Sequence, residues 1–143
     1  MPWLQKISQN IYQSVYNDAE LRYPVSHGSV DGLSIIDDVP NFSSISASLG
    51  DESNYDILKG IRIVRISDVL DDPKSWFYAA NDFKRFKSLA QEISITKQIK
   101  PVIVVLEKEG PYVLEGAHRC AALFELKIPN IPALVVVDYS GYN

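Results

Sequence analysis

The stretch YVLEGAHRCAALFELKIPNIPALVVVD, residues 112–138, decides the fold, because it holds a strand, a helix and a second strand in sequence. Its first three residues form a short β-prone run, and residues 117–126 carry their alanines and leucines on one side of a helix. Pro129 and Pro132 interrupt the chain, and residues 133–137 form an almost wholly apolar run. Such a run is typical of a strand covered on both faces.

Five consecutive residues, 115–119, lie at the predicted strand-to-helix joint. The first turn of a helix has N–H groups without helical partners and a partial positive charge, which suit an anion. Gly116 lets the backbone bend and approach a ligand. Arg119 supplies a planar fork of donors that matches a phosphate, and His118 supplies a donor that titrates near neutral pH. These residues predict a phosphate-binding site.

The composition is that of a soluble globular protein, and 143 residues can bury a core of their own. A net charge of −4 and the lack of a basic block disfavour a large nucleic-acid interface, although a local basic patch stays open. No run reaches membrane-spanning length, and residues 1–10 lack the pattern of a signal peptide. We therefore expect a cytoplasmic protein that does not enter a membrane.

Cysteine and histidine are too rare to form a metal site by themselves. Cys120 is the only cysteine, which excludes an internal disulfide and a thiolate metal centre. His27 and His118 lie far apart in the sequence and form no ligand motif. We expect no protein-bound metal centre from these residue types.

The N-terminal part of the chain predicts one helix and a long irregular segment. Apolar residues repeat at helical spacing over residues 2–16, either to pack on the domain or to bind a partner helix. Residues 17–54 are rich in Gly, Pro, Ser, Asp and Asn. Within them, residues 41–46 are either a polar connection or a loop whose hydroxyl groups meet a ligand.

The middle of the chain predicts a strand and a short turn. Residues 61–66 are rich in Ile and Val and indicate a strand, and Ser67 can cap a helical turn after it. Asp71 and Asp72 then precede a proline. They could bind magnesium or act as a base, and the alternative is a solvated turn.

A second amphipathic helix follows, with Asn81 or Asp82 as its cap and an apolar stripe from Phe83 to Ile93. Its basic residues lie off that stripe and form the densest basic cluster of the chain: Lys84, Arg85 and Lys87. They are either a solvated face or the place of any nucleic-acid contact. The sequence predicts a loop at residues 96–100, a buried strand at residues 101–106 and a turn at residues 107–110.

These elements predict an α/β or α+β domain with a small mixed sheet flanked by helices. We expect residues 1–60 to be an N-terminal helix and irregular extension packed on a core made by residues 61–143.

From residue 61 to residue 138, the order of elements and their motifs resembles the ParB/sulfiredoxin superfamily. Three blocks carry the resemblance to a ParB-type N-terminal, nuclease-like domain: IRIVRISDVL, SLAQEISITKQIKPVIVV and the stretch quoted above. The string Gly116-Ala117-His118-Arg119 is also similar to the Gly-Cys-His-Arg loop of sulfiredoxin.

The resemblance implies that residues 116–119 contact the phosphates of a nucleoside di- or triphosphate, with Mg²⁺ as its counter-ion. It also implies that Lys97, Gln98 and Lys100 line the same pocket. One branch of the superfamily holds bacterial-type small-molecule kinases with an acid just before the glycine, where this chain has Glu115. Glu115 is then a candidate base toward a substrate hydroxyl, or else a carboxylate that pairs with Arg119 or Lys97.

Two departures from the superfamily limit the function. Ala117 occupies the place of sulfiredoxin's nucleophilic cysteine, and Cys120 lies on a different helix face, so we expect no sulfinic-acid reductase. The sequence ends soon after the last predicted strand, without the DNA-binding and dimerisation parts of partition proteins, so we expect no partition protein in that sense.

Three functions remain open at this point. The first is a nucleotide-dependent phosphotransferase or hydrolase, with Glu115, His118 and Asp72 as catalytic residues and a small-molecule acceptor. The second is a non-catalytic ParB-like module that binds a nucleotide or DNA, and the net charge disfavours DNA. The third is an adaptor that keeps the fold without the site.

Overall fold

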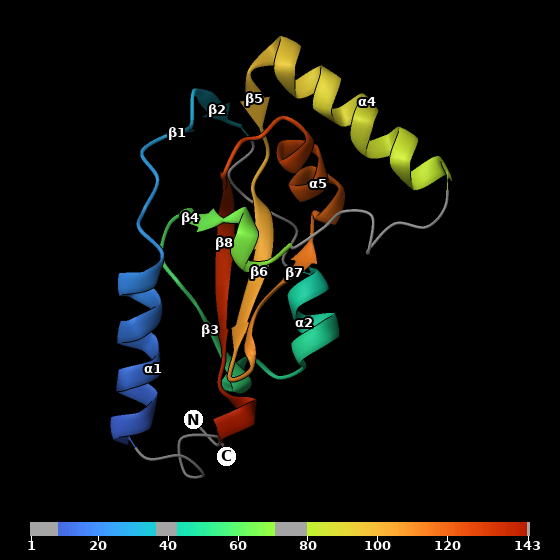
Figure 1. The fold of residues 1–143 in the computed structure, drawn as a ribbon. Helices are drawn as coiled ribbons and strands as arrows, with labels where there is room; N and C mark the ends of the chain where they lie inside the picture. Colours follow the sequence, from blue (N-terminus) through green and yellow to red (C-terminus); the bar gives the residue numbers. More distant parts are fainter. Residues whose placement is uncertain (1–8, 37–42, 71–79, 143) are drawn as a thin grey trace.

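The computed structural model describes residues 9–36, 43–70 and 80–142. Over these residues the chain forms an α+β fold with a five-stranded mixed sheet, a three-stranded sheet and flanking helices (Figure 1). This confirms the predicted fold class. The helices are α1 (Gln9–Arg22), α2 (Ser43–Leu49), α4 (Ala80–Thr96) and α5 (Ala117–Glu125). The strands are β1 (Ser29–Val30), β2 (Leu33–Ile35), β3 (Tyr55–Ile57), β4 (Arg62–Arg65), β5 (Gln98–Ile99), β6 (Val102–Glu107), β7 (Gly110–Glu115) and β8 (Asn130–Asp138).

Strand β8 lies at the centre of the main sheet. Strand β6 pairs with it in parallel along one edge, and β7 continues the sheet as the antiparallel partner of β6. The other edge of β8 is shared, with β4 opposite its first residues and β3 opposite its last residues, both antiparallel. The predicted strands at 61–66, 101–106, 112–114 and 133–137 are therefore confirmed, as is the turn between β6 and β7.

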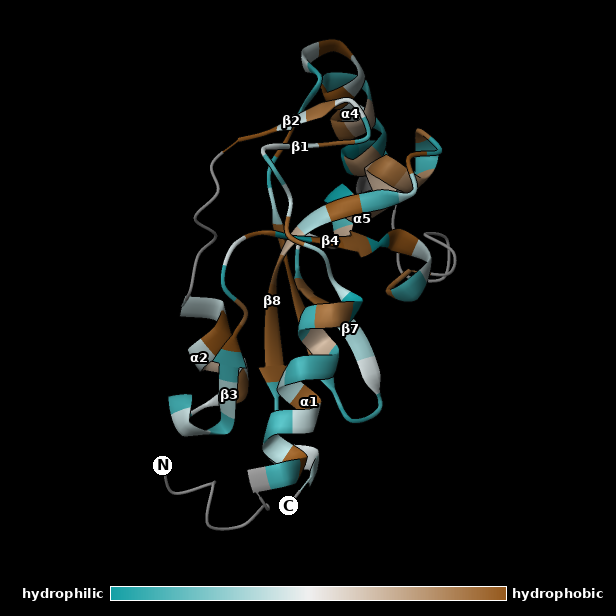
Figure 2. Ribbon diagram, turned by 90° about the vertical axis from the view of Figure 1, so that its left-hand side faces the viewer, coloured by the Kyte–Doolittle hydropathy of each residue, from teal (hydrophilic) through white to brown (hydrophobic). Residues whose placement is uncertain are grey.

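The apolar sequence of β6 and β8 follows from burial on both sheet faces. Val102 and Val104 face the larger core, which contains the buried side of α5, whereas Ile103 and Val105 face a smaller core with Ile45 of α2. Figure 2 shows β8 as hydrophobic along most of its length. Alternation between polar and apolar residues is absent from these strands because neither face meets solvent.

Pro132 lies inside β8, so the expectation that it interrupts the chain before the strand is wrong. It pairs with Ile63 of β4, whose N–H group donates instead to the carbonyl of Pro24 on the far side, at 2.8 Å. The pair is thus one of the antiparallel positions that exchange no hydrogen bond. A proline is tolerated there because pairing with β4 needs no N–H group at this position.

A second, smaller sheet has the order β1-β2-β5 and was not predicted. Strands β1 and β2 form a hairpin around Asp31 and Gly32, which have φ values of 48° and 83°. Two positive φ values fit the tight turn that an Asp-Gly pair favours. Strand β2 then pairs in parallel with β5, so part of the predicted loop at 96–100 is a strand held by the N-terminal segment.

Helix α1 ends at Arg22 rather than near Tyr16, and the part of the prediction before Gln9 lies outside the described residues. The side chains of Tyr12, Val15, Tyr16, Ala19 and Tyr23 pack on the larger core. Because the first 60 residues also supply β3, they contribute to the main sheet itself. The division into parts at residue 60 stays a prediction.

Three local expectations are corrected. Residues 43–49 form α2, not an irregular loop. After β4 a single 3-10 turn spans Ile66–Asp68, so Ser67 lies within the turn and does not cap it. Helix α4 begins at Ala80, which puts Asn81 and Asp82 inside its first turn. The predicted apolar stripe of α4 is confirmed, since Phe86, Ala90 and Ile93 are buried in the core.

Candidate functional site

Gly116 forms the joint between β7 and α5. Its φ of 104° and ψ of 24° are left-handed, a conformation that glycine adopts readily. The side chain of Val102 lies directly against it, and a Cβ atom on residue 116 would stand 2.8 Å from the Val102 Cβ atom and closer still to its Cγ1. Both the turn and the close packing therefore require glycine, which fixes where α5 begins.

Arg119, in the first turn of α5, is partly buried. Its Nη1 donates a hydrogen bond of 2.8 Å to the carbonyl oxygen of Pro101, just before β6. Arg119 also lines a cavity of about 110 Å³ together with Gln98 and Lys100 and, from α4, Leu89 and Glu92. Three of the predicted site residues, Arg119, Gln98 and Lys100, are thus brought together.

His118 faces a different hollow of about 440 Å³, which lies between α4 and the start of α5. The hollow is lined from α4 by Lys84, Arg85, Ser88, Leu89 and Glu92. Two cations, a hydroxyl group and one carboxylate therefore stand opposite the histidine. Because Leu89 and Glu92 line both cavities, the two hollows are neighbours along one face of α4.

The side chain of Glu115 points away from the two cavities that Arg119 and His118 line. Its Oε2 accepts a hydrogen bond of 3.2 Å from the Ser44 hydroxyl of α2. It lines neither of the two cavities, whereas His118 and Arg119 face α4 and β5. The contact brings a hydroxyl of the predicted segment 41–46 to a candidate catalytic residue.

The remaining candidate residues occupy varied positions. Ala117 is a partly buried residue of the first turn of α5. Lys97 ends α4 in a left-handed conformation, φ 56°, and its N–H donates to the Ile93 carbonyl, but its side chain lines neither cavity. Asp72 lies outside the described residues.

Ser88, Leu89 and Glu92 of α4 were not predicted as site residues. The sequence carries a signal for Ser88 and Glu92. Together with Arg85 they are spaced three and four residues apart, so the three residues lie on one helix face. The sequence predicts the basic cluster of α4 as a surface feature, but its position opposite His118 depends on how α4 packs against α5.

Cys120 is fully buried, one turn into α5. Burial raises the pKa of its thiol to about 12, and the neighbouring Arg119 charge offsets only part of this rise. The thiol therefore stays protonated near neutral pH and is unsuited to attack a substrate. Its side chain packs in the larger core, together with Val102 and Val104 of β6.

Within the described residues, no group of three or more His, Cys, Asp and Glu side chains could hold a metal ion. In the same part of the chain, no helix is both long and apolar enough to cross a membrane.

No protein-family model and no curated protein matches this chain. A crystal structure of sulfiredoxin from Arabidopsis thaliana is similar to it, with 23% sequence identity and a TM-score of 0.43. The match covers 52% of this chain and 82% of that chain. This partial likeness implies nothing about the activity, substrate or partners of the present protein.

Proposed function

We propose that this protein binds the phosphate groups of a nucleoside di- or triphosphate between α4 and the start of α5. The observation that carries the proposal is the hollow of about 440 Å³ in which Lys84 and Arg85 stand opposite His118. The neighbouring cavity of about 110 Å³ adds Arg119 and Lys100. Guanidinium and ammonium groups next to a helix N-terminus form a combination that suits phosphate oxygens.

The local charge supports an anionic ligand. The chain carries a formal net charge of −4, yet the described residues that line the two cavities include four cations, Lys84, Arg85, Lys100 and Arg119, and one carboxylate, Glu92. A concentration of cations in a concave region attracts anions more strongly than the same charges spread over a surface. A diphosphate or triphosphate matches this surplus of positive charge.

We further propose that the bound nucleotide is used for phosphate transfer to a small hydroxyl-bearing acceptor, or for hydrolysis. Glu115 would accept the proton of the attacking hydroxyl or water, and the cationic residues would stabilise the charge on the transferred phosphoryl group. The Ser44 hydrogen bond holds the Glu115 carboxylate on the α2 side, outside both cavities, so the acceptor would have to approach the bound phosphates from that side. Ala117 stands where sulfiredoxins have their cysteine, so the proposal does not include sulfinic-acid reduction.

Magnesium fits this proposal without a dedicated protein site. Mg²⁺ keeps several waters and is usually bound by substrate phosphates with one or two carboxylates. Glu92 is the carboxylate that lines both cavities, and it would supply such a ligand. The ion would neutralise phosphate charge during transfer.

The second candidate is a non-catalytic ParB-like module that binds a nucleotide or DNA. One observation favours it: Lys84, Lys87 and Ser88 line a further open hollow of about 460 Å³ on α4, so the basic face is continuous with the His118 hollow. The negative net charge weighs against DNA, because phosphate contacts supply most of the affinity for it.

A thermal-shift screen with nucleoside mono-, di- and triphosphates, each with and without Mg²⁺, tests the first proposal. A ligand that binds only the folded state raises the melting temperature by mass action. We expect an increase with di- or triphosphates that is lost in Arg85→Ala. Absence of any shift, together with no heat of binding by calorimetry, would refute nucleotide binding. A shift without turnover on any acceptor would favour the non-catalytic module.

A further inference from the structure

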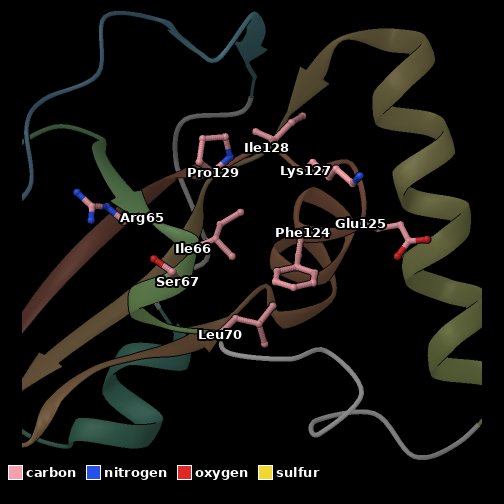
Figure 3. A pocket seen from close by; sticks show the side chains of 9 residues that line it. All are labelled: Arg65, Ile66, Ser67, Leu70, Phe124, Glu125, Lys127, Ile128 and Pro129. Carbon is pink, nitrogen blue, oxygen red and sulfur yellow. The ribbon is translucent and has the colours of Figure 1, made fainter.

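A larger cavity lies at the other end of α5 from the proposed phosphate site. It has a volume of about 630 Å³ and is bordered by the end of β4, the turn that follows it, and the C-terminal end of α5 (Figure 3). None of its lining residues lines the His118 or Arg119 cavities. It is therefore a separate feature of the fold, and it does not depend on the proposed nucleotide site.

The interior of this cavity is apolar. Figure 3 shows Ile66 and Leu70 on one side and Phe124 on the other, with their side chains around a common space, and Ile128 lines the cavity beside Pro129. Ile66 and Leu70 are buried in the core, whereas Phe124 keeps 44% of its surface exposed. An exposed aromatic ring in the wall of a concave apolar site is a common feature of small-molecule pockets.

Two cations stand at the edges of the cavity. Arg65 lies on the β4 side and Lys127 on the α5 side (Figure 3). Neither side chain makes a hydrogen bond or ion pair with another described residue, and Glu125 is the acid among the lining residues. Because the whole chain carries a net charge of −4, a cationic edge is a local departure that favours an anionic ligand.

Lys127 occupies a position that usually belongs to glycine. It has a φ of 60°, its N–H donates to the Phe124 carbonyl, and the Ile128 N–H donates to the Leu123 carbonyl. These two bonds form the Schellman motif, in which the left-handed residue after the helix is most often glycine. A side chain there is strained, yet it presents an ammonium group at the helix C-terminus and the cavity edge.

We propose that this cavity binds a small organic carboxylate with an apolar, ring-bearing body. The body would pack against Phe124 and Ile128, and the carboxylate would pair with the Lys127 ammonium. The volume lies within the range of about 300–1,000 Å³ that is typical of small-molecule sites. The Arg65 guanidinium points away from the other lining side chains (Figure 3), which leaves the Lys127 ammonium to pair with one monoanionic group. The concave shape fits a small molecule better than a flat protein surface.

The test uses 4-phenylbutyrate and its neutral analogue 4-phenylbutan-1-ol, which share the same apolar body. Both are titrated into the full chain, and binding is followed by NMR chemical shifts of the Ile and Leu methyl groups. We expect both to shift Ile66, Leu70 and Ile128, and the carboxylate to bind about three- to fivefold more tightly, which is the range of an exposed charge pair.

Substitutions locate the carboxylate. Lys127→Gln removes the charge and keeps the strained residue, whereas Lys127→Gly also relieves the strain and should raise the melting temperature. Both should abolish the preference for the carboxylate over the alcohol. Arg65→Gln, on the opposite side of the cavity, is the matched control and should leave the preference within about twofold. Phe124→Ala should weaken both ligands.

Several results would overturn the proposal. One is equal binding of acid and alcohol by the native chain, and another is the absence of saturable shifts at the cavity. A preference that disappears with Arg65→Gln rather than Lys127→Gln would contradict the assignment of the carboxylate. If light scattering shows a dimer that Phe124→Ala dissociates, the cavity is covered by a second copy of the chain and not by a small molecule.

Discussion

The Nη1 atom of Arg119 donates a hydrogen bond to the carbonyl oxygen of Pro101 at 2.8 Å. The bond joins the first turn of α5 to the residue that precedes β6. Gln98 and Lys100 lie just before Pro101, so the same contact keeps them next to the guanidinium. Arg119 therefore has two roles to separate by experiment, one in holding this joint together and one in the proposed binding of phosphate.

Arg119→Ala should weaken the binding of a nucleoside di- or triphosphate by about 1.5–3 kcal/mol, the usual range for a charge-assisted hydrogen bond. Titration calorimetry on both proteins measures it. The loss of the Pro101 bond should also lower the free energy of unfolding by about 1 kcal/mol. Arg65→Ala is the control, because Arg65 lines neither phosphate-site cavity. Equal affinity in Arg119→Ala and the native chain would remove Arg119 from the site.

Gly116→Ala should destabilise the fold by about 3 kcal/mol, because it adds the cost of a left-handed alanine to a clash with the buried Val102. Gly28→Ala is the matched control: Gly28 also has a positive φ, 89°, but nothing lies within 4 Å of a Cβ atom there. It should cost only about 1 kcal/mol. Urea unfolding measures both. Similar costs at the two positions would mean that Val102 yields to the added methyl group.

The strands and helices that were predicted correctly have a signal within a few consecutive residues. The buried strands β6 and β8 carry it as continuous apolar runs, and α4 carries it as an apolar stripe from Phe83 to Ile93. The β1–β2 hairpin also has a local signal, the Asp31-Gly32 pair, which sequence reasoning overlooked among the many polar residues around it.

The rest of the fold depends on contacts between residues far apart in the sequence. Strand β5 has two residues, and it exists because β2 pairs with it across more than 60 intervening residues. Likewise, Ser44 meets Glu115 only after α2 packs beside β7. The predicted group at the start of α5 is brought together in part, since Arg119, Gln98 and Lys100 share a cavity while Glu115 faces α2.

Glu115→Gln should lower the turnover number by about 10²- to 10⁴-fold, the usual contribution of a general base, with nucleotide affinity nearly unchanged. The amide oxygen of glutamine can still accept the Ser44 hydrogen bond, so the side chain should keep its position. Phosphate transfer or release is measured with a panel of hydroxyl-bearing acceptors. Full activity in Glu115→Gln would exclude the carboxylate as the base, and an inert native chain would favour the binding module.

Tyr12→Phe should destabilise the fold by about 1–2 kcal/mol, because the Tyr12 hydroxyl donates to the Asp56 carboxylate at 2.6 Å. The hydroxyl of Tyr139 donates to the same oxygen at 3.0 Å, so Asp56 connects α1, β3 and the residue after β8. Tyr142→Phe is the control, since its hydroxyl makes no hydrogen bond with another described residue. Equal unfolding midpoints for the two variants would assign no stability to the Asp56 contact.

The same contact predicts a loss of stability in alkali. Burial and the Asp56 carboxylate raise the pKa of Tyr12 to about 12, above its ordinary value of 10.0. A group whose pKa is higher in the folded state stabilises that state fully below the unfolded pKa. The Tyr12 contribution should therefore be constant below pH 10 and disappear between pH 10 and about 12. Denaturation of the native chain and Tyr12→Phe at several pH values should give converging stabilities over that interval.

Cys120 should react slowly with a thiol reagent in the native protein and rapidly once the chain is unfolded. The side chain is fully buried, and burial raises the pKa of its thiol to about 12 from an ordinary value of 9.0, so the reactive thiolate is scarce even at pH 9. Because labelling then requires the chain to open, its rate should increase with urea. Cys120→Ala should keep any nucleotide-dependent activity and cost roughly 1–2 kcal/mol of stability, as for other small buried side chains. Rapid labelling of the native chain that is slowed by added ATP would instead put Cys120 in the ligand site, and a cysteine-based mechanism would have to be considered again.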